Sequence, residues 1–141
     1  MGVLVVLDTC VLVSGLRSRR GASFRILSWI GQGAFELAVS VPLVIEYEDV
    51  LSRQASSLQL NAQDVGALLD YICGVARQQS IFFLWRPLLS DPKDDMVAEV
   101  AVAAQCDAVV TFNAKDFGSI HRFGIAVLTP GQFLSKLGAT Q

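Results

Sequence analysis

The sequence has little charge and no sign of a second domain. Charged residues make up 17% of the chain and apolar residues 52%, a balance that argues against disorder and favours one buried core. No internal repeat, low-complexity linker or change in composition divides the 141 residues, a normal length for one domain. We therefore expect a single domain over residues 1–141.

Cysteine and histidine are too few for two common kinds of site. The three cysteines, Cys10, Cys73 and Cys106, are odd in number and scattered, which excludes a disulfide framework and a CxxC zinc spacing. The single histidine, His121, cannot form a histidine-rich metal site, and its loop-like surroundings favour a surface position. We expect all four side chains to be buried or incidental to function.

Long apolar runs and a basic surplus are also missing. No run approaches the roughly 20 apolar residues of a membrane span, and Asp8 ends the opening run without the features of a secretory signal. We expect a cytoplasmic protein with no membrane partner. The net charge of -2 gives no general basic surface, so any nucleic acid must be held locally.

Five short apolar runs alternate with helical stretches. The runs, typical of strands covered on both faces, are Val3–Leu7, Phe35–Val39, Ile81–Trp85, Ala108–Thr111 and Ile125–Leu128. The helical stretches are Ser23–Ile30, Pro42–Leu51, Ala62–Ala76 and Pro92–Ala104, and the start signals before the last three are Ser40, Asn61 and Asp91. This alternation predicts an α/β fold with a mostly parallel sheet, whose ligands bind at the carboxyl ends of the strands.

Acidic residues stand at two of the predicted positions for chemistry. Asp8 directly follows the first apolar run, where it serves either a functional site or the N-terminus of a helix beginning near Cys10. Glu46 and Glu48 flank the buried face of the helix Pro42–Leu51, at about 100° to either side. Helical periodicity does not choose between these two glutamates.

Three carboxylates crowd the start of the fourth predicted helix. They belong to Asp91, Asp94 and Asp95, and all suit the positive end of the helix dipole. Asp91 also suits the N-cap, so capping alone would explain the three acids. At about 100° per residue, Asp94 lies over the predicted buried stripe, whereas Asp95 projects from the opposite side. We therefore expect Asp94 to be directed toward the protein interior and Asp95 to face away from it.

Polar side chains also follow the fourth apolar run. Thr111, Asn113 and Asp116 would fit an ordinary turn, but with Asp8 and Asp94 they repeat one pattern of acids at strand exits and helix starts. Carboxylates that converge repel one another unless a divalent cation binds them, and oxygen ligands favour Mg²⁺ or Mn²⁺. Such ions activate water for phosphodiester cleavage.

Four segments, in this order, resemble the PIN domain family, notably its branch of VapC-like ribonucleases from toxin–antitoxin pairs. The segments are Leu7–Thr9 with Val11–Ser14, Ser40–Val50, Asp91–Asp94 with Ala101, and Val110–Phe117. The resemblance covers about Val3 to Leu128. It implies a three-layer α/β/α fold with a five-stranded parallel sheet in the order 3-2-1-4-5. It also implies an Mg²⁺- or Mn²⁺-dependent endoribonuclease that cleaves single-stranded or structured RNA, with an antitoxin partner.

The resemblance also assigns roles to residues. The acids of the family, which are catalytic and hold the metal, fall on Asp8, Glu46, Asp94 and Asp116. Supporting polar groups fall on Thr9, Thr111 and Asn113. The family commonly has asparagine where this chain has Cys10, a departure that affects metal preference and rate more than fold.

Basic and apolar surface residues suggest partners. The basic residues that could contact RNA phosphates or an acidic partner are Arg17, Arg19, Arg20 and Lys115, although such runs more often simply face water. The family usually dimerises. Because Val44 and Ile45 lie away from the core stripe of their helix, we expect them to form a homodimer contact.

Two other functions stay open at this point. A haloacid-dehalogenase-like phosphatase also carries an aspartate after its first strand, but its second aspartate would stand at the position of Cys10. A PIN-fold module that binds nucleic acid or protein would keep the fold without turnover. A nuclease assay with and without Mn²⁺ separates all three.

Overall fold

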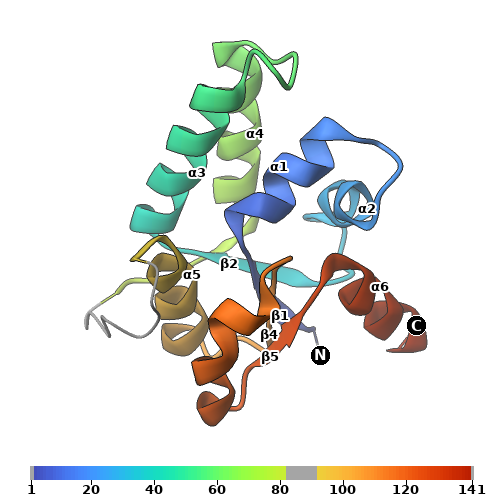
Figure 1. Ribbon diagram of the computed structural model, residues 1–141, viewed down its shortest axis with the longest axis vertical. Coiled ribbons are helices and arrows are strands. Elements are labelled where there is room, and N and C mark those ends of the chain that lie inside the picture. Colours follow the sequence, from blue (N-terminus) through green and yellow to red (C-terminus); the bar gives the residue numbers. More distant parts are fainter. Residues whose placement is uncertain (1, 82–91, 141) are drawn as a thin grey trace.

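Five strands form one parallel sheet in the computed structural model, which describes residues 2–81 and 92–140 (Figure 1). The strands are β1 (Leu4–Leu7), β2 (Glu36–Val39), β3 (Arg77–Gln78), β4 (Ala108–Val110) and β5 (Ala126–Leu128). Their order is β3-β2-β1-β4-β5, and every neighbouring pair is parallel. The predicted order 3-2-1-4-5 is confirmed, with the fully buried β1 at the centre.

Helices cover both faces of this sheet. The helices are α1 (Thr9–Arg17), α2 (Ala22–Trp29), α3 (Val41–Gln54), α4 (Ala62–Val75), α5 (Pro92–Ala103), the 3₁₀ helix η1 (Ala114–Phe123) and α6 (Pro130–Thr140). On one face α2 lies between α1 and α6, and on the other α5 packs on β1, β2 and β4 with η1 beside it (Figure 1). The paired helices α3 and α4 extend away from the sheet. The three-layer α/β/α fold is thus confirmed, and no helix in the described part is long and apolar enough to cross a membrane.

Local start signals place the helices as predicted. The Ser40 hydroxyl accepts a hydrogen bond from the backbone N–H of Leu43, and Asn61 forms a reciprocal capping box with Asp64. The predicted cap Asp91 lies outside the described residues. A further signal of this kind was missed: Thr129 and Gln132 exchange hydrogen bonds at the start of α6.

The third strand of the sheet begins four residues before the predicted run, Ile81–Trp85. The third strand is Arg77–Gln78, Ile81 belongs to no strand, and the rest of the predicted run lies outside the described residues. Both residues of β3 are exposed, because β3 is an edge strand that pairs only with β2. Such a strand needs no buried apolar run, which was the pattern used to find it. The other four strands lie within a residue of their predicted bounds.

Candidate active site

The pairing of β1 with β4 brings two polar residues together at the carboxyl edge of the sheet. Leu7 pairs with Val110, so the next residues, Asp8 and Thr111, emerge side by side. Both are buried, and the Thr111 hydroxyl donates a hydrogen bond of 2.7 Å to Oδ2 of Asp8. The sheet register therefore sets the position of the Asp8 carboxylate.

The Asp8 carboxylate has two further hydrogen-bond partners. Its Oδ1 accepts from the backbone N–H of Thr9 at 2.8 Å, so the predicted helix cap is confirmed and leaves Oδ2 for other contacts. The Cys10 thiol donates to Oδ2 at 3.4 Å. Burial, and next the charge of Asp8, raises the pKa of Cys10 to about 11. At neutral pH Cys10 is therefore a protonated donor to Asp8, at the position where the family commonly has an amide.

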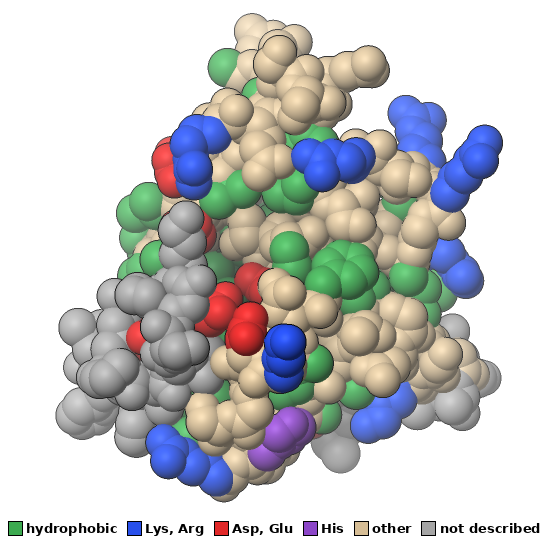
Figure 2. Space-filling model, viewed as in Figure 1, with side chains coloured by type: hydrophobic (Ala, Val, Ile, Leu, Met, Phe, Trp, Pro, Cys, Tyr) green, Lys and Arg blue, Asp and Glu red, His purple; other side chains and the backbone are tan. Residues whose placement is uncertain are grey.

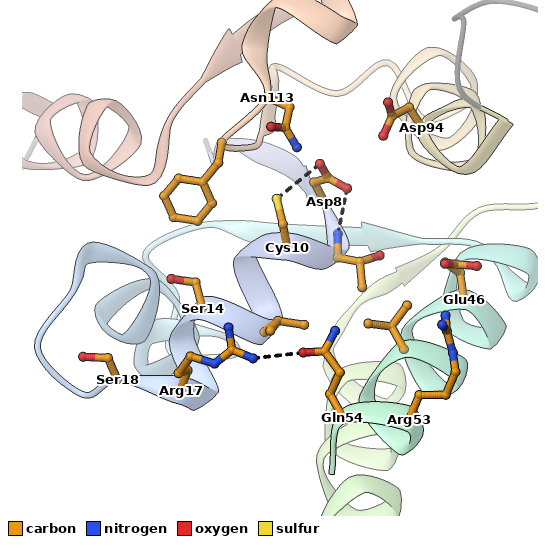
Figure 3. Close-up of a pocket in the computed structure, with 14 residues that line it drawn as sticks. Asp8, Cys10, Ser14, Arg17, Ser18, Glu46, Arg53, Gln54, Asp94 and Asn113 are labelled. Carbon is orange, nitrogen blue, oxygen red and sulfur yellow. Dashed lines mark hydrogen bonds between the residues drawn. The ribbon is translucent and has the colours of Figure 1, made fainter. Parts of the chain in front are cut away.

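A pocket of about 660 Å³ opens beside Asp8 (Figure 3). Three carboxylates line it from three different elements: Asp8 at the end of β1, Glu46 on α3 and Asp94 on α5. In the space-filling view, Asp and Glu side chains gather near the centre of this face, with Lys and Arg side chains spread around them (Figure 2). The fold thus brings three of the four predicted acids to one cavity.

The choice between Glu46 and Glu48 is made by the anchoring of α3. Tyr47 is fully buried, and its hydroxyl donates a hydrogen bond to the backbone oxygen of Leu7, directly before Asp8. This burial, and next the charge of Asp8, holds the pKa of Tyr47 well above its usual value. With Tyr47 fixed there, Glu46 lines the pocket, whereas Glu48 is exposed outside it.

The prediction for Asp95 is wrong. Asp94 is half-buried and lines the pocket as expected, but Asp95 is only 2% exposed rather than on the open side of its helix. The reason is that α5 packs against α3 and η1 as well as against three strands, so more than one of its faces is covered. A helical wheel with one apolar stripe does not reveal such a second covered face.

Asp116 and three of the four predicted basic residues are not brought to the pocket. Asp116 and Lys115 are exposed on η1, and Arg19 and Arg20 are exposed after α1. None of these four is among the described residues that line the cavity. Arg17 does line it, as do the predicted supporting residues Thr9 and Asn113 (Figure 3).

Sequence reasoning missed several residues of the pocket. They are Val13, Ser14, Ser18, Val50, Arg53, Gln54 and Phe112. Gln54 stands out because its Oε1 accepts a hydrogen bond of 3.0 Å from the Arg17 guanidinium, across the gap between α3 and α1. No pattern in the sequence signals a pair 37 residues apart.

Comparison with known proteins agrees with this geometry. The sequence pattern of the PIN domain matches residues 4–115, which is most of the chain. The chain belongs to the PIN domain family. PIN domains are generally nucleases. The match decides against the phosphatase alternative, which rested on a single aspartate after the first strand.

The fold of this PIN domain is also found in a solved complex. That complex is VapBC2 from Rickettsia felis, bound to a DNA fragment from the promoter of the VapBC2 proteins. A chain of that complex matches with a TM-score of 0.63 at 16% identity, over 89% of this chain and 98% of its own length. Identity this low shows a common fold only. Among curated proteins, none matches the sequence.

The chemistry of the PIN domain pocket suits a hard divalent cation. Asp8, Glu46 and Asp94 offer carboxylate oxygens, the donors that Mg²⁺ and Mn²⁺ prefer. In residues 2–81 and 92–140, no three acidic, histidine or cysteine side chains are close enough together to form a ready metal site. The donor set therefore fits such an ion, although its members share a cavity rather than a closed coordination shell.

Proposed function

We propose that this PIN domain is a metal-dependent endoribonuclease that uses Mg²⁺ or Mn²⁺. The observation that supports this most is the convergence of Asp8, Glu46 and Asp94 on one open pocket, from three separate elements. A cavity of about 660 Å³ admits a nucleotide, being in the range of ordinary ligand pockets. Family membership supports the same class of reaction.

The residues in and beside the pocket have three kinds of role in this proposal: holding the cation, orienting Asp8 and binding RNA. Asp8, Asp94 and Glu46 would hold the cation, which supplies activation of water and neutralisation of the charge that develops on the phosphoryl group. Thr111 and the backbone of Thr9 orient the Asp8 carboxylate through their hydrogen bonds. The Arg17 guanidinium would bind a backbone phosphate of the RNA. Asp116, the fourth acid of the family pattern, is exposed on η1 and does not line the pocket, so it has no role with the cation in this proposal.

RNA cleavage by the purified protein tests the proposal. Cleavage in Mg²⁺ or Mn²⁺ should stop when EDTA is added. The substitution Glu46→Gln should remove most of the activity, whereas Glu48→Gln, the same change two residues away but outside the pocket, should retain it. Cleavage that persists in EDTA, or equal activity of the two variants, would contradict the proposed site. A wild-type protein that binds RNA without cleaving it would instead identify the non-catalytic binding module.

We also propose that the protein is the toxin of a toxin–antitoxin pair in the cytoplasm. The support is the family resemblance together with the shared fold of VapBC2 from Rickettsia felis, which was solved as a complex. A small DNA-binding-like protein encoded next to this chain, whose addition inhibits RNA cleavage, is the expected finding. A neighbouring product that has no effect on cleavage would argue against the pairing.

A homodimer through α3 is the third part of the proposal. Ile45 is 60% exposed and Val41 on the same helix is 67% exposed, whereas Val44, which we also expected at the contact, is half-buried. Light scattering at tens of micromolar, above the roughly micromolar affinity of a weak dimer, should give twice the monomer mass. Ile45→Glu should shift the protein to monomer, and a monomeric wild type would remove this contact.

A further inference from the structure

Phe112 is an exposed aromatic residue inside the pocket. Its side chain lines the cavity, and the residue is 51% exposed. Single exposed apolar residues are common on protein surfaces and need no explanation by themselves. Phe112 differs because it is the one aromatic among the described residues of the cavity, and because it shares that cavity with three carboxylates and Arg17.

The backbone around Phe112 is tied to the Asp8 carboxylate. The preceding Thr111 hydroxyl accepts a hydrogen bond of 3.0 Å from the N–H of Asn113 while it donates to Asp8. The Cys10 thiol donates to the same oxygen of Asp8 that accepts from Thr111. The backbone that carries the aromatic side chain is therefore held next to the proposed reacting centre.

A cationic side chain, Arg17, lies in the same cavity as Phe112. Arg17 lines the same cavity from α1, with its guanidinium held by the 3.0 Å hydrogen bond to Gln54 (Figure 3). A nucleotide would contact all three kinds of group in this pocket. Its scissile phosphate would meet the metal held by the carboxylates, its base would meet the flat aromatic face, and a flanking phosphate would meet the guanidinium. Stacking of unpaired bases on aromatic side chains, next to cations that follow the backbone, is how proteins hold single-stranded nucleic acid.

We propose that Phe112 is a substrate-binding residue that stacks against an unpaired base next to the scissile phosphate. This inference rests on the proposed ribonuclease function and adds a residue that holds its substrate. A base in a duplex is paired and stacked on its neighbours, and it would have to leave the helix to reach Phe112. The same geometry makes Phe112 a substrate-binding residue rather than one that takes part in bond cleavage.

Kinetics of three variants test this role. Phe112→Ala should raise KM for a single-stranded RNA oligonucleotide by roughly 5- to 150-fold with kcat little changed, because stacking stabilises bound substrate and transition state alike. Phe112→Tyr, which retains the ring, should stay near wild type. Phe123→Ala provides the control, since Phe123 is also exposed, at 36%, but lies outside this cavity. Thermal melting of each variant separates a binding effect from loss of fold.

Binding without cleavage keeps this test independent of the proposed activity. A single-stranded RNA oligonucleotide containing 2-aminopurine, mixed with protein in EDTA, should lose fluorescence on binding to wild type and to Phe112→Tyr but not to Phe112→Ala. Unchanged KM and fluorescence in Phe112→Ala would overturn the inference, as would wild-type cleavage of a duplex at the rate of the single strand. If the RNA binds as expected but is never cleaved, the ribonuclease proposal fails while the stacking role stands. If Phe112→Ala instead weakens only the binding of a protein partner, the residue belongs to a protein interface and the inference is wrong.

Discussion

Two aspartates stand at opposite edges of the same pair of strands, β1 and β4. Asp8 follows β1 at the carboxyl edge, is 7% exposed and lines the pocket. Asp107 precedes β4 at the amino edge, is exposed, and accepts a hydrogen bond of 2.8 Å from the backbone N–H of Leu4. Each carboxylate ties one strand to its neighbour, yet within the described part of the chain only Asp8 lines a cavity together with other acids.

Hydrogen bonding alone therefore does not mark a functional acid in this fold. The two edges differ in which other acidic residues the connections between strands and helices bring near the aspartate. Because helices follow strands in a parallel sheet, the N-termini of α1, α3 and α5 all begin at the carboxyl edge. Those N-termini carry partial positive charge, which favours Asp8 at the N-cap of α1 and Asp94 in the first turn of α5. Glu46 reaches the same pocket from the second turn of α3. At the amino edge, Asp107 serves the pairing of strands.

The largest expected effect on RNA cleavage comes from replacing each of these two aspartates with asparagine. Asp8→Asn should lower RNA cleavage by about 100-fold or more, since metal binding contributes several kcal/mol to the transition state. Its stability should fall by about 1–2 kcal/mol, because an amide has one oxygen and cannot accept from both the Thr9 N–H and the Thr111 hydroxyl. Asp107→Asn should retain full cleavage and cost about 1 kcal/mol or less of unfolding free energy. Equal cleavage by the two variants would erase the proposed difference between the edges.

The next largest effect distinguishes the roles of two adjacent acids at the carboxyl edge, Asp94 and Asp95. Asp94→Asn should lower cleavage by roughly 10- to 100-fold with little change in stability, since Asp94 is a half-buried pocket residue. Asp95→Asn should instead cost about 1–3 kcal/mol of unfolding free energy, because its carboxylate is buried within the protein. Urea unfolding and cleavage rates, measured on the same two proteins, read both quantities. An inactive but fully stable Asp95→Asn protein would reverse the assignment.

A smaller loss is expected for the hydroxyl that orients Asp8. Thr111→Val keeps the shape of the side chain and removes the donor to Asp8, so cleavage should fall about tenfold and stability by about 1–2 kcal/mol. Thr129→Val is the matched control, since the Thr129 hydroxyl caps α6 after β5 and lies outside the pocket. Its cleavage rate should equal that of wild type. Loss of activity in both variants would show that the readout follows stability rather than the position of Asp8.

The smallest effect concerns the amino edge at high pH. Burial, and next the charge of Asp107, raises the pKa of Cys106 from 9.0 to about 12. Between these values the unfolded chain has released the thiol proton while the folded chain retains it, so the contribution to stability is complete below pH 9 and is lost as pH rises toward 12. Cys106→Ala should therefore show a shallower fall of Tm than wild type across that range. Parallel curves would mean that the Cys106 thiol does not contribute.

Much of the fold could be predicted because its signals are local. Ser40, and Asn61 with Asp64, start their helices through hydrogen bonds to backbone only three residues away, and those contacts form in the structure as expected. The buried runs that became β1 and β4 are recognisable because a strand covered on both faces must be apolar throughout. The third strand escaped this rule because it lies at the edge of the sheet.

The sequence by itself determined the alternation of strands and helices, and so placed Asp8 at the exit of the central strand. Only the tertiary structure decided which of the expected acids share its pocket: Glu46, which helical periodicity could not separate from Glu48, lines it with Asp94, whereas Asp116 does not. The physical reason is that periodicity gives angles within one helix, whereas the direction that faces a cavity depends on what anchors the helix. For α3 that anchor is the buried Tyr47 bonded to Leu7, and for α5 it is packing on several sides, which also buries Asp95.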